Sequence, residues 1–127
     1  MNESSKKDLI ERYLAAYNAF DVDSMLALLS QDIRFENYCG NVLTAEATGR
    51  DEFRRLAERA STLFSEREQR IAALQFNHDA AIATIDYHGT LAMDIPEGPV
   101  AGTVIDLQGS SEFSFDHDRI VRIVDRS

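Results

Sequence analysis

The chain has 127 residues, of which 44% are hydrophobic and 28% are charged, a composition that suits one globular domain with a single core. The formal net charge of −9 and the pI near 4.7 argue against nucleic acid and anionic membranes as partners, because both carry negative charge. No apolar run approaches the roughly 20 residues that span a bilayer, the N-terminus lacks the apolar stretch of a signal peptide, and Cys39 is the one cysteine, so we expect a cytoplasmic protein without a disulfide.

The first residues predict two consecutive amphipathic helices. Apolar residues recur at helical spacing over residues 9–20, after a capping-box-like Ser5-x-x-Asp8. Asp21 then predicts the N-cap of a second helix, whose apolar stripe lies within residues 22–29. Two adjoining helices of this kind need a broad apolar surface to cover.

A strand and a third helix are expected next. Residues 33–38 alternate with period two, which places Phe35 and Asn37 on the same face of a short strand. We expect residues 40–48 to form a loop. Residues 48–51, Thr-Gly-Arg-Asp, then open a helix with an apolar stripe.

After Ser65 the periodicity changes from helical to extended and stays so. Residues 68–77 and 80–94 predict two long strands, with Asn-His-Asp at 77–79 as the turn between them. Residues 96–99, Pro-Glu-Gly-Pro, interrupt the chain before a final hairpin.

The final hairpin has the clearest alternation in the chain. Residues 104–115 separate a mostly apolar face from a polar one, and Ser111 is the polar side chain on the apolar face. Residues 116–118, Asp-His-Asp, supply the turn, and residues 120–124 return as a second strand. Gly109, in the middle of the first strand, predicts a bend or bulge.

Three helices early in the chain and antiparallel strands after them predict an α+β protein, with the helices covering one face of a curved antiparallel sheet. Long strands with a glycine in mid-strand favour a half-open cone over a closed barrel. The chain has no internal repeat, low-complexity tract or linker, so residues 1–127 are expected to form a single domain.

This pattern resembles the cone-shaped fold shared by nuclear transport factor 2, ketosteroid isomerase and SnoaL-type polyketide cyclases. The local matches are Ala-Phe-Asp-Val-Asp at residues 19–23, Phe-Glu-Asn at 35–37, Gly-Arg-Asp at 49–51 and the strand of residues 109–115. The resemblance covers nearly the whole chain and implies a SnoaL-like domain. Its motifs are structural, and the superfamily includes isomerases, cyclases, hydrolases, dehydratases and non-catalytic members, so the resemblance leaves the reaction open.

The resemblance also implies site residues. It places Tyr13 where ketosteroid isomerase has its oxyanion-binding tyrosine, Asn37 where that enzyme has its base, and Ser111 where it has a protonated aspartic acid. Tyr13 and Asn37 are therefore the candidate catalytic residues. An amide cannot act as a general base near neutral pH, so steroid isomerase activity is not expected.

The expected function is binding of a small hydrophobic organic molecule in an apolar pocket. The candidate ligand-binding residues are Tyr13, Phe35, Asn37, Ser111 and Phe113. If the protein is an enzyme, a cofactor-free isomerase, cyclase or lyase reaction is expected, in which Tyr13 polarises a carbonyl. The alternative is a non-catalytic ligand-binding or dimerisation module. The sequence contains no metal-binding or cofactor-binding motif, so neither a metal nor a cofactor is expected.

Several residues keep two interpretations. Glu36 has the opposite parity from Asn37 and would reach the pocket only if the strand were bulged. Asp86 and His88 share one strand face and could form an acid–base pair or face solvent, because alternation does not say which face is inside. Tyr17 is interpreted as a packing residue. The polar face of the final strands predicts a homodimer that pairs sheet to sheet.

Overall fold

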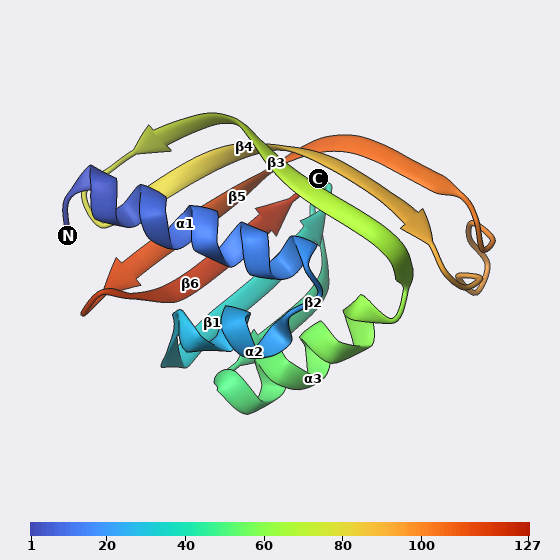
Figure 1. Ribbon diagram of the computed structural model, residues 1–127, viewed down its shortest axis with the longest axis horizontal. Coiled ribbons are helices and arrows are strands. Elements are labelled where there is room, and N and C mark those ends of the chain that lie inside the picture. The colour runs from blue at the N-terminus through green and yellow to red at the C-terminus, as the bar shows by residue number, and fades with distance from the viewer.

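The computed structural model describes all 127 residues as three helices and six strands (Figure 1). In chain order the elements are α1 (Glu3–Asn18), α2 (Val22–Ala27), β1 (Leu29–Cys39), β2 (Val42–Thr48), α3 (Arg50–Ser61), β3 (Phe64–Phe76), β4 (Ala80–Leu91), β5 (Val104–Asp116) and β6 (Arg119–Arg126). None of the three helices combines the length and the hydropathy that crossing a membrane requires.

The strands form one sheet in the order β2-β1-β6-β5-β4-β3, which curves around the helices without closing (Figure 1). The expected α+β cone is therefore confirmed. The sheet is mixed and not wholly antiparallel, because β1 and β6 pair in parallel while the other neighbours are antiparallel. This parallel pair arises because α2 delivers β1 to the free edge of the closing hairpin, where it runs beside β6.

The predicted loop at residues 40–48 is wrong. Residues 42–48 form β2, which pairs with β1 in an antiparallel hairpin and is an edge strand. Ala47 is the one buried residue of this strand, so the sequence carries no regular alternation of apolar and polar positions there. An edge strand with so little buried surface has a weak sequence signal.

The helix starts follow capping chemistry. Asp21 is the N-cap of α2 as expected, and its carboxylate accepts a hydrogen bond from the Ser24 backbone N–H at 3.1 Å. In α1 the N-cap is Asn2, not Ser5: the Asn2 side-chain oxygen accepts from the Ser5 N–H at 2.7 Å. Asparagine and serine are both strong N-cap residues, and the helix therefore begins three residues earlier than the capping-box pattern predicted.

The main core lies between the helices and the concave face of the sheet. Its most buried members come from α1, from the helix–sheet joint and from the closing hairpin: Ile10, Leu29, Ile33, Phe113, Ile120 and Ile123. Figure 1 shows α1 crossing the concave side of the sheet, with α2 and α3 beside the β1 and β2 end.

The closing hairpin follows its turn chemistry. His117 and Asp118 both have positive φ, at 50° and 61°, as a two-residue type I′ turn requires. Of the bend or bulge predicted at Gly109, the bulge is absent, since the β4–β5 ladder runs through this residue without a register shift. Glycine is needed there for a different reason: a Cβ would collide with the carbonyl oxygen of Arg126 on β6.

Candidate functional site

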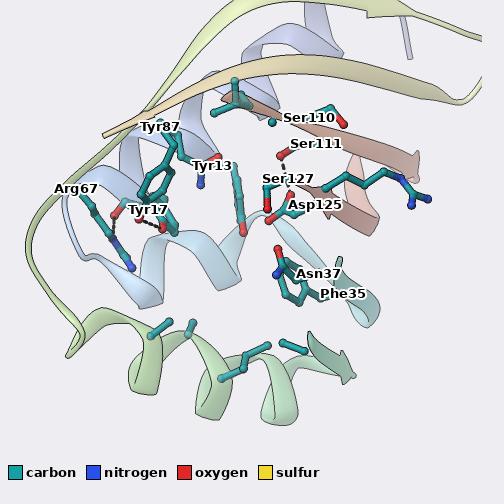
Figure 2. Close-up of a pocket in the computed structure, with 18 of the residues that line it drawn as sticks. Tyr13, Tyr17, Phe35, Asn37, Arg67, Tyr87, Ser110, Ser111, Asp125 and Ser127 are labelled. Atoms are coloured by element: carbon teal, nitrogen blue, oxygen red, sulfur yellow. Dashed lines mark hydrogen bonds between the residues drawn. The ribbon is translucent and has the colours of Figure 1, made fainter. Parts of the chain in front are cut away.

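A cavity of about 390 Å³ lies between the helices and the concave face of the sheet (Figure 2). Twenty-three residues line it, and 14 of them are hydrophobic. The apolar walls come mainly from α3 and from β4 and β5, while a few polar side chains reach in from α1, β1, β3 and β6. An apolar cleft with a small number of placed polar groups is typical of a small-molecule site.

Four of the five candidate ligand-binding residues line this cavity: Tyr13, Phe35, Asn37 and Ser111. The fifth, Phe113, is fully buried behind them and packs edge-on against Tyr13, with ring centroids 5.9 Å apart. Phe113 therefore supports the ring of Tyr13 from the core. The Asn37 amide nitrogen donates to Thr44 Oγ1 at 2.7 Å, beside the register shift between Asn37 and Tyr38 in the β1–β2 ladder.

The alternation of β5 leads to a residue that the sequence analysis missed. Ser111 faces inward as expected, and its cross-strand neighbour on β6 is Asp125. Ser111 Oγ donates to Asp125 Oδ1 at 2.6 Å, and Asp125 also lines the cavity (Figure 2). Asp125 lies two residues after the buried Ile123, and that parity was the available signal.

Burial raises the pKa of the Asp125 carboxyl from 3.8 to about 6, because the apolar surroundings disfavour its charged form. The hydrogen bond from Ser111 opposes this shift by stabilising the carboxylate. The second carboxyl oxygen, Oδ2, makes no hydrogen bond to the protein. One oxygen is thus held in place, and the other can meet a ligand.

The Tyr13 hydroxyl makes no hydrogen bond to the protein either. The residue is 4% exposed, and its hydroxyl is open to the cavity, since no fully buried side-chain oxygen lacks a partner. Burial raises its pKa well above 10, and the nearby Asp125 charge raises it further. The hydroxyl therefore stays protonated and can donate a hydrogen bond. Figure 2 shows the Tyr13 ring beside the Asp125 carboxyl group within the cavity.

A second polar group lies toward β3 and β4. The hydroxyls of Tyr17 and Tyr87 are 2.9 Å apart, and burial raises the pKa of both. The Arg67 guanidinium lies 3.7 Å above the Tyr17 ring centroid, and its Nε donates to the Tyr17 carbonyl oxygen at 3.0 Å. Tyr17, interpreted from sequence as packing, therefore also lines the cavity, with Arg67 and Tyr87.

The cavity is not lined by Glu36, Asp86 or His88, the residues for which the sequence left two interpretations. His88 pairs with Asp106 at 2.7 Å, and Asp86 accepts from the Gln108 side chain at 2.9 Å, both on the outer face of the sheet. Glu36 is held by Arg122 at 2.8 Å, and this pairing lowers the pKa of its carboxyl. No group of three or more His, Cys, Asp or Glu side chains is arranged to hold a metal ion.

Comparison with known proteins agrees with this architecture. A family model described as "SnoaL-like domain" matches residues 10–123. A search of curated protein sequences finds no significant match.

Many solved structures share the fold. A candidate polyketide cyclase from Xanthomonas campestris pv. campestris aligns over 100% of this chain and 93% of its own length, with a TM-score of 0.84 and 24% identity. A candidate polyketide cyclase from Pseudomonas putida KT2440 aligns over 92% and 86%, with a TM-score of 0.74 and 26% identity. An epoxide hydrolase from M. tuberculosis aligns over 97% and 82%, with a TM-score of 0.76 and 18% identity.

Proposed function

The chain belongs to the SnoaL-like domain family, and from this premise we propose that its cavity binds a small, mainly apolar carbonyl compound and moves a proton at the carbon next to the carbonyl without a cofactor. The observation that carries the proposal is the Asp125 carboxyl group, which faces an apolar cavity with one oxygen free and the Tyr13 hydroxyl nearby. A base and a hydrogen-bond donor at one cavity wall are the two groups that enolisation needs.

Asp125 Oδ2 accepts the proton as the carbon–hydrogen bond breaks, and the electron pair of that bond passes into the carbonyl as an enolate. Tyr13 donates a hydrogen bond to the enolate oxygen. In an isomerase, protonated Asp125 returns the proton to a different carbon. In a cyclase, the enolate carbon attacks a second carbonyl of the same ligand, and the proton goes to the alkoxide formed there. The geometry supports both outcomes equally.

The pKa of Asp125 suits this role. A base with a pKa of about 6 is mostly ionised at pH 7, yet it binds a proton more strongly than an ordinary exposed carboxylate. A positioned general base contributes roughly 10²–10⁴-fold to a rate. Steroid isomerase activity was not expected because Asn37 cannot act as a base. Under the present proposal Asp125 supplies a carboxylate from β6, so that expectation no longer follows from Asn37 alone.

The test is exchange of carbon-bound hydrogen for deuterium. The methyl protons of 2-acetylnaphthalene are followed by ¹H NMR in D₂O with the wild-type protein, Asp125→Asn and Asp86→Asn. Wild type and Asp86→Asn should exchange these protons above the buffer rate, and Asp125→Asn should fall by at least about 10²-fold. Asp86→Asn is the matched control because it changes the same side chain on the outer face of the same sheet.

The competing function is a ligand-binding module without catalysis. Saturable binding of 2-acetylnaphthalene, with exchange at the buffer rate in all three proteins, would favour the module. Exchange that persists in Asp125→Asn would instead reject Asp125 as the base.

We also propose a two-fold homodimer formed through the outer face of the sheet. The support is a broad face of polar side chains on β4 and β5, including Asp86, Gln108 and Glu112, of the kind that can pair with a second copy. Light scattering at micromolar concentration should give twice the chain mass. A monomer alone at that concentration would end the proposal.

A further inference from the structure

Arg67 is the one arginine in the core of this protein. The residue is 5% exposed, yet no carboxylate lies within 4 Å of its guanidinium group. A buried cation without an ionic partner loses hydration that nothing charged replaces. Arg67 also lines the cavity, where it faces the same space as Asp125.

Part of this side chain has a structural role. Nε donates to the Tyr17 carbonyl oxygen near the C-terminal end of α1, where a positive charge is favourable. The guanidinium also stacks on two aromatic rings, at 3.7 Å from the Tyr17 centroid and 4.5 Å from that of Phe20. These contacts use one of the five N–H donors and the flat face of the group. By geometry neither terminal nitrogen donates a hydrogen bond to a protein acceptor, although the guanidinium lies close enough to the Tyr17 hydroxyl to lower the pKa of that group.

Two terminal nitrogens in one plane match the two oxygens of a carboxylate, which they can bind side by side. We propose that Arg67 forms an anion-binding subsite in the cavity, so that the ligand carries a carboxylate at this end. The neighbouring hydroxyls of Tyr17 and Tyr87 offer a further hydrogen bond to the same group.

The two ends of the cavity then select an amphiphilic ligand. In Figure 2, Arg67 lies at one side and Asp125 at the other, with the three tyrosines between them. A carboxylate bound by Arg67 would keep clear of the negative charge of Asp125. It would also point the opposite end of a rigid apolar ligand toward Asp125 and Tyr13. The ligand class is therefore an apolar keto acid, and the keto part of this statement rests on the proposed function.

The carboxylate subsite is tested by binding alone, with two probes of the same shape. Calorimetric titration at pH 7.5 compares 2-naphthoate with neutral 2-naphthamide. Wild type should bind the naphthoate about tenfold more tightly, since a charge-assisted pair replaces a neutral one. Arg67→Gln should bind both probes with similar affinity and keep its affinity for the naphthamide. Arg70→Gln is the matched control, because it removes the same charge from an exposed position on the same strand.

Equal binding of the two probes by wild type, or an undiminished preference in Arg67→Gln, would overturn the subsite. If Arg67→Gln does not fold, Arg67→Lys decides: a preference reduced at least about threefold supports paired hydrogen bonds, and an unchanged one rejects them. The titration is repeated with Asp125→Asn. A preference that remains there while wild type shows no deuterium exchange would reject the proposed reaction and keep the subsite. Deuterium exchange by wild type without a preference for naphthoate would keep the proposed reaction and reject the subsite.

Discussion

The polar side chains on the two faces of the sheet differ in whether protein groups pair with them. On the outer face, partners are already in place: His88 Nδ1 lies 2.7 Å from an Asp106 carboxylate oxygen, and Glu36 accepts from Arg122 at 2.8 Å and from the Tyr38 hydroxyl at 2.9 Å. The His88–Asp106 pair is exposed, whereas the Glu36 side chain beside Arg122 is 13% exposed. Surface pairs of this kind contribute little to stability and leave no buried group unsatisfied.

On the inner face, three polar side chains keep atoms that no protein group pairs, and these atoms adjoin the cavity. Asp125 has a free oxygen, Tyr13 has a free hydroxyl and Arg67 has two free terminal nitrogens. All three line one cavity. No fully buried side-chain nitrogen or oxygen lacks a hydrogen-bond partner, so the unpaired atoms of these three residues are the ones that the cavity reaches. This difference between the faces supports the proposal that the inner groups bind a ligand.

The largest expected effect on stability comes from Asp125→Asn. The folded protein holds Asp125 at a pKa of about 6, above the ordinary 3.8, so ionisation at neutral pH opposes folding. Removing the charge should raise the free energy of unfolding at pH 7.5 by on the order of 2 kcal/mol. The gain should shrink as the pH falls through 6 toward 3.8, because the wild-type carboxyl is then protonated in both states.

Urea unfolding of wild type, Asp125→Asn and the outer-face control Asp86→Asn at pH 7.5 and 4.5 measures this. A loss of stability in Asp125→Asn at pH 7.5 would mean that the carboxylate holds the fold together, and the contrast between the two faces would fail.

A smaller effect is expected for Tyr13→Phe. The substitution removes a hydroxyl that has no protein partner, so the free energy of unfolding should stay nearly unchanged. Binding or exchange of 2-acetylnaphthalene should weaken by on the order of 1–2 kcal/mol, because the hydrogen bond to the carbonyl oxygen is lost. Calorimetric binding and deuterium exchange measure the two parts. Unchanged binding and unchanged exchange would mean that Tyr13 is only a packing residue of the core.

A smaller change again is expected for Ser111→Ala. The Ser111 hydrogen bond favours the ionised form of Asp125, so its loss should move the pKa of Asp125 further upward. The pH at which exchange reaches half its maximum should rise with it, while the plateau at high pH changes little. A midpoint that moves downward, measured from pH 5 to 9, would contradict the assigned hydrogen bond.

The smallest effect is expected on the outer face. Asp106→Asn weakens the exposed pair with His88, whose pKa the Asp106 hydrogen bond raises. Exchange of 2-acetylnaphthalene at pH 7.5 should match wild type, because neither residue lines the cavity. A clear loss of exchange would mean that the outer face also takes part in the reaction.

Most of the fold could be predicted from the sequence because it rests on local periodicity. Alternation identified the strands that have one buried face, and residues with turn or capping chemistry, such as Asp21 and His117, marked where elements begin and end. The edge strand β2 was missed since it buries one residue. The parallel pairing of β1 with β6 joins segments far apart in the sequence. Local periodicity does not indicate which strands pair.

The candidate site was predicted only in part. Tyr13 and Ser111 stood out as polar residues on apolar faces. Asp125 was missed because the last strand was expected to end at residue 124, whereas β6 runs to Arg126 and pairs Asp125 with Ser111. Arg67 was missed for a related reason: the strand was expected to begin at residue 68, whereas β3 begins at Phe64 and turns Arg67 inward. Boundary errors of a few residues decided both cases.

The contrast between the inner and outer faces of the sheet is tested most directly by measuring the pKa of Asp125. The side-chain carboxyl carbon of this residue is followed by ¹³C NMR from pH 3 to 9, with Asp125→Asn used to assign the signal. We predict a midpoint near pH 6, since burial raises the pKa to about 6. A midpoint at or below the ordinary 3.8 would mean that the carboxylate is fully stabilised within the fold, and Asp125 could then not serve as the base.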